Sequence, residues 1–165
     1  LIGCAEGGVE IEKLAATDPD KIVTVRVDIA KAMDADGVHV GQDDMAALDA
    51  RAKLGPDKLI GVSAHTVEEA LLAEKQGADY LGVGAVFPTS SKSDVGEMSY
   101  ETLKAICKAV SIPVVAIGGI SGENVGKLAG SGICGVAVIS AIYAAKDVKA
   151  AAADLKTTVK EMLRA

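Results

Sequence analysis

The chain has 165 residues with a formal net charge of −6 at pH 7, and half of its residues are hydrophobic although only 2% are aromatic. This length suffices for one domain with a substantial core, and the acidic balance argues against a nucleic-acid partner. The sequence has no run of 18 apolar residues, no signal peptide and no cysteine pair with metal-ligand spacing. We therefore expect a single domain over residues 1–165, in the cytoplasm and away from membranes.

Short β-branched runs alternate with segments of helical period along the whole chain. This alternation predicts a parallel sheet whose strands are joined by crossover helices. Thr66 and Ser99 are expected to cap two of the helices, the first in a capping box with Glu69. The expected strands are 22–27, 35–40, 59–63, 80–87, 113–119 and 135–140, and the expected helices are 28–33, 45–54, 67–76, 100–110, 121–130 and 148–162.

Two architectures fit this alternation: a doubly wound open sheet and a TIM (β/α)₈ barrel. No glycine-rich dinucleotide fingerprint opens the first unit, which disfavours the doubly wound sheet. Polar residues follow many strands rather than one switch point, which favours the barrel. Six strands fall short of closure, and the length lies below the usual minimum of roughly 200 residues. We therefore expect an N-terminally truncated barrel of about six of eight βα units, with unpaired edges that favour a homo-oligomer.

The most informative stretch is the apolar run 80–87 and the polar residues after it. The run indicates a strand buried on both faces, and Pro88 ends it because proline cannot donate to a sheet ladder. Thr89, Ser91 and Lys92 follow at once. Two hydroxyls and an ammonium at the carboxyl end of a parallel strand suit an anion. A surface turn with a solvated lysine remains the alternative.

Other chemistry-bearing residues also follow strands, where a barrel would gather them on one face. Glycines after the last strands allow backbone amides to approach a phosphate, and a carboxylate nearby suggests a metal-bound polyphosphate. Plainer roles stay open: a helix N-cap for Asp44, a tight turn for Gly118-Gly119, and structural roles for His39 and His65. The set comprises Thr24, Arg26, Gln42, Asp43, Asp44, Ser63, His65, Gly118, Gly119, Ile139 and Ser140.

Five segments together resemble the thiamine-phosphate synthase family, in the order and spacing that the family shows. The resemblance extends from about residue 22 to the C-terminus and is specific as a combination. The segments are GVHVGQDD at 37–44, GVSAHT at 61–66, GADY at 77–80, PTSSK at 88–92 and IPVVAIGGI at 112–120.

This resemblance implies a (β/α)₈ barrel that joins hydroxymethylpyrimidine diphosphate to thiazole phosphate, with release of pyrophosphate and assistance from Mg²⁺. It assigns catalytic contacts with the diphosphate to Ser63 and Lys92, and one Mg²⁺ contact to Asp44. Thr89 and Ser91 would contact the thiazole, and Gly119, Ile139 and Ser140 would hold its phosphate. The full substrate-binding set implied is Thr24, Ser63, Thr89, Ser91, Lys92, Gly119, Ile139 and Ser140.

The sequence departs from the family at two points. Val25 occupies the place of a second Mg²⁺ carboxylate, and valine cannot coordinate a metal. The family's Gln-x-Arg-x-Lys stretch, which binds diphosphate, has no match in residues 1–21. Two other functions therefore stay open, a thiazole tautomerase with the same phosphate pocket and a non-catalytic phosphate-binding remnant. Ser63 and the 89–92 pattern favour the synthase.

Overall fold

A computed structural model describes the chain except residues 1–22, 25, 33, 89–97 and 165. Six strands form one parallel sheet in which consecutive strands are neighbours, in the order β1-β2-β3-β4-β5-β6. The strands are β1 Val23–Thr24, β2 Gly37–Val40, β3 Leu59–Ala64, β4 Tyr80–Val83, β5 Val114–Ile117 and β6 Gly135–Ala137. The predicted α/β class and parallel sheet are confirmed.

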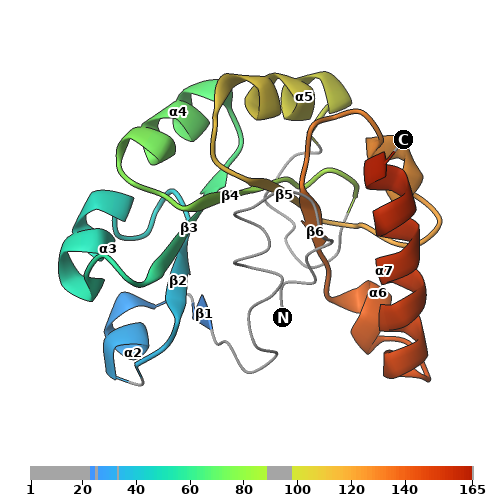
Figure 1. Cartoon of the computed structure of the whole chain (residues 1–165), viewed down its shortest axis with the longest axis horizontal. Helices are drawn as coiled ribbons and strands as arrows, with labels where there is room; N and C mark the ends of the chain where they lie inside the picture. The colour runs from blue at the N-terminus through green and yellow to red at the C-terminus, as the bar shows by residue number, and fades with distance from the viewer. Residues whose placement is uncertain (1–22, 25, 33, 89–97, 165) are drawn as a thin grey trace.

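The helices cover one side of this sheet. Figure 1 shows the sheet as an arc, with α2 to α5 and α7 along its convex side. A doubly wound sheet would carry helices on both faces, so the placement of the described helices on one side disfavours that alternative. Among the described residues the sheet stays open rather than closing into a barrel. The helices are α2 Val27–Ala32, α3 Ala47–Leu54, α4 Val67–Lys75, α5 Tyr100–Ala109, the 3₁₀ helix η1 Val125–Leu128, α6 Ser140–Tyr143 and α7 Val148–Arg164.

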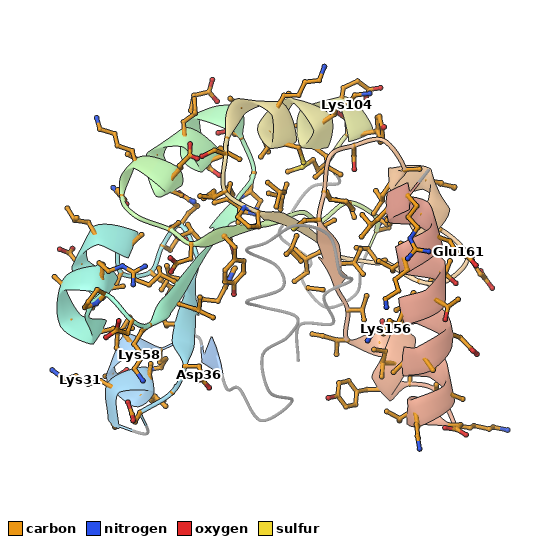
Figure 2. The ribbon with its side chains drawn as sticks, viewed as in Figure 1. Lys31, Asp36, Lys58, Lys104, Lys156 and Glu161 are labelled. Atoms are coloured by element: carbon orange, nitrogen blue, oxygen red, sulfur yellow. The ribbon has the colours of Figure 1, made fainter. Side chains whose placement is uncertain are left out.

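The core lies between the sheet and the helices. Strand residues such as Val38, Ile60 and Leu81 are completely buried, and Ala50 and Ala70 meet them from α3 and α4. Alanine lets a helix approach the sheet closely, which explains how the chain builds a core almost without aromatic residues. Charged residues lie on the helical layer, for example Lys31 on α2 and Lys104 on α5 (Figure 2). No described helix has the length and apolar composition needed to cross a membrane.

Several predicted elements end or form differently from the sequence expectation. The expected strand 22–27 is only β1 Val23–Thr24, because Val27 already begins α2, and the expected strand 113–119 is shortened to β5 Val114–Ile117. The run 80–87 is buried to Val86, but β4 ends at Val83. Beyond that point the amides of Val86 and Phe87 donate to the carbonyls of Ile117 and Gly118, outside the regular ladder. Strand β6 ends at Ala137, and the short helix α6 follows it. The expected helix 121–130 is only the 3₁₀ turn η1, in a segment interrupted by glycines.

Both predicted N-caps are confirmed. Thr66 Oγ1 accepts the amide of Glu69 at 3.1 Å, and Ser99 Oγ accepts the amide of Thr102 at the same distance. The capping-box prediction is wrong by one residue. The Glu69 carboxylate accepts the amide of His65 at 2.7 Å rather than that of Thr66. The Glu69 side chain therefore binds the backbone of His65, the residue that precedes the N-cap of α4.

An ion pair ties together the loops that precede β3 and β4, at the end of the sheet where these strands begin. Arg51 Nη2 lies 2.6 Å from Asp79 Oδ2, and the same oxygen accepts the amide of Ile60 at 2.7 Å. Arg51 also donates to the backbone carbonyls of Lys58 and Gly77. One guanidinium on α3 thus binds backbone carbonyls and a carboxylate in both loops. These charge-assisted bonds hold the starts of β3 and β4 together, at the end of the sheet opposite to the carboxyl ends of the strands.

Candidate functional site

A cavity of about 220 Å³ opens at the carboxyl ends of β3, β4, β5 and β6. It brings together predicted site residues that come from three different strand ends. Among the described lining residues His65 alone has an ionisable side chain, so the polar contacts that they offer come mainly from hydroxyls and backbone groups. The lining comprises Ser63, His65, Gly82, Gly84, Ala85, Ile117, Gly118, Gly119, Ile120, Ala137, Val138, Ile139 and Ser140.

The loop after β5 requires glycine at two consecutive positions. Gly118 and Gly119 have φ angles of 98° and 63°, in the region that favours glycine. A Cβ on Gly118 would lie 2.6 Å from Ala85 Cα, and one on Gly119 would lie 2.7 Å from the carbonyl oxygen of Phe87. Both glycines therefore let this loop pack directly on the segment after β4. The tight-turn interpretation of Gly118-Gly119 is confirmed, and their role toward an anion stays a prediction.

Asn124 holds the same loop, and sequence reasoning missed it. Its Oδ1 accepts the amide of Ser121 at 2.8 Å, and its Nδ2 donates to the carbonyl of Gly119 at 2.8 Å. In a trans peptide the carbonyl and the following amide point in opposite directions, so the amide of Ile120 faces away from Asn124. An asparagine three residues after a serine in a glycine-rich turn is the signal that could have identified it.

Ile139 and Ser140 form the cavity wall after β6. Ser140 is the first residue of α6, and the carbonyl of Ile139 accepts the amides of Ile142 and Tyr143. The first amides of a helix have no partner within it, so those of Ser140 and the next residue are not used by α6 itself. Ile139 is 65% exposed, which is unusual for isoleucine and leaves its side chain at the rim. The two predicted residues thus lie side by side at the cavity.

Ser63 is held from two directions. Its Oγ lies 3.0 Å from His39 Nε2, and its carbonyl accepts the side-chain amide of Gln42 at 2.6 Å. His39 Nδ1 in turn lies 3.0 Å from the hydroxyl of Tyr80. The prediction that His39 is a satisfied structural histidine is confirmed, because both ring nitrogens have partners. Tyr80, predicted to be a core residue, is buried.

His65 contacts the helix that follows it, α4. Its Nδ1 lies 3.3 Å from Glu69 Oε2, one turn along, and its backbone amide donates to the same oxygen. This pairing supports the structural interpretation of His65, although the residue also lines the cavity.

Asp44 closes the turn after β2. Its Oδ2 accepts the amide of Gly41 at 2.8 Å, and the side chain is exposed. Helix α3 has Ala46 at its N-cap, so the interpretation of Asp44 as an N-cap is wrong. Within the described part of the chain no three His, Cys, Asp or Glu side chains gather as a metal cluster. Asp44 can supply one carboxylate ligand, which suits Mg²⁺ when phosphate and water complete the octahedron.

Four predicted substrate contacts cannot be placed by their side chains. Thr89, Ser91 and Lys92 lie outside the described residues, as does Val25. Thr24 belongs to β1, where it pairs with Val38 of β2, but its side chain is not among those described. These residues stay predictions.

Comparisons with known proteins identify relatives over most of the chain. The sequence model of the family described as thiamine monophosphate synthase matches residues 7–142. The thiamine-phosphate synthase of Clostridium tetani is 55% identical over 134 residues, which are 81% of this chain and 64% of that protein. That of Pyrococcus abyssi is 48% identical over 96% of this chain and 76% of its own length.

A solved structure gives the same relationship. The thiamine phosphate pyrophosphorylase from Pyrococcus furiosus superimposes with a TM-score of 0.79 and 42% identity, covering 93% of this chain and 73% of that one. The chain spans a little less than two thirds of the length of the Clostridium tetani relative. Identity at this level over most of the chain, together with the match of the family model, establishes its ancestry. The chain belongs to the thiamine monophosphate synthase family.

Proposed function

We propose that this chain is a thiamine-phosphate synthase, which joins hydroxymethylpyrimidine diphosphate to thiazole phosphate and releases pyrophosphate. Its family membership and the names of its relatives support this activity. The observation that carries the proposal is the cavity at the strand ends, because Ser63, Gly119, Ile139 and Ser140 meet there from separate parts of the sequence.

The cavity suits the thiazole phosphate. Its walls are largely apolar, with Ile117, Ile120 and Val138 among them, and would accommodate a small heterocycle. The amides after Gly119 and at the start of α6, with the hydroxyl of Ser140, would bind the phosphate as hydrogen-bond donors. Thr89 and Ser91 would add hydroxyl contacts to the thiazole itself. Positioning the thiazole nitrogen in this way supplies the proximity that the reaction needs.

The diphosphate would bind beside the cavity, in contact with Ser63, Lys92 and Thr24. In the reaction the bond between the pyrimidine methylene carbon and the diphosphate oxygen breaks, and its electron pair leaves with the diphosphate. The thiazole nitrogen then donates its lone pair to that carbon. Charge accumulates on the leaving group, so Lys92 and the Ser63 hydroxyl would stabilise the transition state by neutralising and hydrogen-bonding the diphosphate.

Asp44 would hold Mg²⁺ together with the diphosphate oxygens. A bound Mg²⁺ would supply further charge neutralisation for the leaving diphosphate. Asp44 remains exposed at the carboxyl end of β2, and its Oδ2 is already oriented by the amide of Gly41. A single carboxylate is a weak site, so we expect no measurable Mg²⁺ binding in the absence of diphosphate.

The six βα units are proposed to be the last six of a (β/α)₈ barrel, forming one domain over residues 1–165. Sequential parallel strands and helices on the convex side of an arc support this architecture. The outer edges of β1 and β6 expose backbone N–H and C=O groups if no further strand pairs with them. Self-association into a homo-oligomer would cover these groups.

The proposal is tested by measuring thiamine phosphate formation and, separately, calorimetric binding of each substrate. Lys92→Ala should abolish synthesis while leaving thiazole phosphate affinity nearly unchanged, because Lys92 is assigned to the diphosphate. Lys31→Ala, which removes the same charge from an exposed position on α2, is the matched control and should behave as the parent. Equal synthesis by parent and Lys92→Ala would refute the assignment.

The same calorimetry separates the synthase from a non-catalytic phosphate binder. That alternative is favoured by Val25, where the family has a metal carboxylate. It predicts thiazole phosphate binding without binding of the pyrimidine diphosphate and without synthesis. Binding of both substrates together with product formation would exclude it.

A further inference from the structure

A chain of hydrogen-bonded side chains crosses three strands and ends at Ser63. The hydroxyl of Tyr80 on β4 lies 3.0 Å from His39 Nδ1 on β2, and His39 Nε2 lies 3.0 Å from Ser63 Oγ on β3. The two rings are 5.4 Å apart, tilted by 40°. Tyr80 is only 1% exposed, so this connection is made largely out of water. His39 itself is not a cavity-lining residue, whereas Ser63 is.

Two strand glycines make room for the imidazole. In the sheet register His39 is opposite Gly61, Gly61 is opposite Tyr80, and Ser63 is opposite Gly82. A Cβ on Gly61 would collide with both Tyr80 Cζ and His39 Nδ1, and one on Gly82 would lie 2.9 Å from His39 Cε1. Glycine is unfavourable inside a strand unless something requires the space. Here the missing side chains allow His39 and Tyr80 to meet across β3.

The chemistry of the partners indicates how the protons are arranged. A phenol with a pKa near 10 is a better hydrogen-bond donor than the N–H of a neutral imidazole, and an imidazole nitrogen is a better acceptor than a phenol oxygen. Tyr80 is therefore expected to donate to Nδ1. The ring proton of neutral His39 then lies on Nε2 and is donated to Ser63 Oγ.

We propose that His39, oriented by Tyr80, is a positioning residue that turns the proton of the Ser63 hydroxyl toward an anionic phosphoryl oxygen at the cavity. Because Nε2–H occupies one lone pair of Ser63 Oγ, the serine proton must find another acceptor. Gln42 fixes the backbone of the same serine from the other side. The inference rests on the proposed function, since it deepens the role assigned to Ser63 toward the diphosphate.

The first test is the tautomer of His39, measured by two-bond ¹H–¹⁵N correlation spectra of the unmodified chain. The chain has only two histidines, so His65→Gln assigns both ring systems. We expect neutral His39 to carry its proton on Nε2, to keep it there in Ser63→Ala, and to lose this preference in Tyr80→Phe. A proton on Nδ1 in the parent would overturn the proposal, because Ser63 would then donate to His39 rather than to a ligand.

The second test is calorimetric binding of pyrophosphate, with two substitutions of His39 compared. A glutamine can place an amide donor near the position of Nε2, whereas an asparagine is too short to reach Ser63. We expect His39→Asn to weaken pyrophosphate binding by about tenfold, as does Ser63→Ala, and His39→Gln to recover most of it. The double variant His39→Asn/Ser63→Ala should bind no more weakly than either single variant.

Unfolding curves of both His39 variants provide the control for folding. Equal pyrophosphate affinity in parent and folded His39→Asn, or additive losses in the double variant, would refute the positioning role.

The test of the positioning role can be separated from the test of the proposed function. If the tautomer and binding pattern hold but no thiamine phosphate forms, the synthase activity is refuted and the positioning role stands. If synthesis occurs and His39→Asn binds pyrophosphate as the parent does, the positioning role alone is refuted.

Discussion

Three glycine-to-alanine substitutions separate the two reasons why the loop after β5 needs glycine. Gly122 has no positive φ, and no atom lies near an added Cβ. Gly77 has a φ of 86°, but the space around an added Cβ is open. Gly119 has a φ of 63°, and an added Cβ would also collide with the carbonyl oxygens of Pro88 and Phe87. Gly122→Ala therefore reports neither effect, Gly77→Ala reports backbone strain alone, and Gly119→Ala reports strain plus steric conflict.

The expected losses in unfolding free energy follow from these terms. Gly122→Ala should be nearly neutral, within about 0.5 kcal/mol. Gly77→Ala should cost about 1–2 kcal/mol, the penalty of a left-handed conformation for an L-residue. Gly119→Ala should cost about 2–5 kcal/mol, because displacing backbone atoms adds a further 1–3 kcal/mol or so.

Urea unfolding of the four proteins, with thiazole phosphate titrations of the folded variants, measures both consequences. Because Gly119 lines the cavity, its substitution should also weaken ligand binding, whereas Gly77→Ala should not. If Gly119→Ala destabilised the chain no more than Gly77→Ala, packing against the segment after β4 would not be what requires glycine there.

Further expectations concern groups away from the cavity. Asp79→Asn should cost about 1–3 kcal/mol of unfolding free energy, because it removes the charge-assisted bond to Arg51, and an unchanged urea midpoint would contradict this. Hydrogen bonds from the Ser111 hydroxyl and amide lower the pKa of the Glu74 carboxyl. The contribution of this carboxylate to stability should therefore be complete at neutral pH and decline as the pH falls below about 4.5. In curves of unfolding free energy against pH, Glu74→Gln should lose this acid dependence. Burial raises the pKa of the Cys107 thiol to about 11, so iodoacetamide at pH 8 should alkylate it roughly 10²-fold more slowly than in the urea-unfolded chain, and equal rates would show that the thiol is accessible.

The fold was predictable where one physical signal dominates. Short β-branched or apolar runs alternate with segments of helical period, so all six strands could be located from the sequence, and serine and threonine caps placed two helix starts. Strand ends were less predictable. The run 80–87 stays apolar after β4 ends at Val83, because its residues remain buried to Val86. Their backbone hydrogen bonds there go to the end of β5 outside the regular ladder. Apolar composition reports burial and cannot separate these two cases.

The site was predictable in part for a related reason. The carboxyl ends of parallel strands meet at one edge, so the order of strands and polar residues along the chain is enough to group Ser63, Gly119 and Ser140. The residues that orient them could not be found in this way. The bond between His39 and Ser63 depends on the register of two strands, and the bond from Asn124 to the Gly119 carbonyl depends on the conformation of one loop. The first is not encoded in a local pattern of residue types, and the Ser-x-x-Asn pattern at 121–124 indicates the Asn124 turn but not which carbonyl its side chain contacts.

Titration calorimetry of the unmodified chain with thiazole phosphate alone tests the central claim most directly, namely that the cavity between β3 and β6 receives this phosphate. The account predicts one binding site per chain, with affinity lost in Gly119→Ala and retained in Gly122→Ala. Absence of binding, or equal affinity in the parent and a folded Gly119→Ala variant, would contradict it.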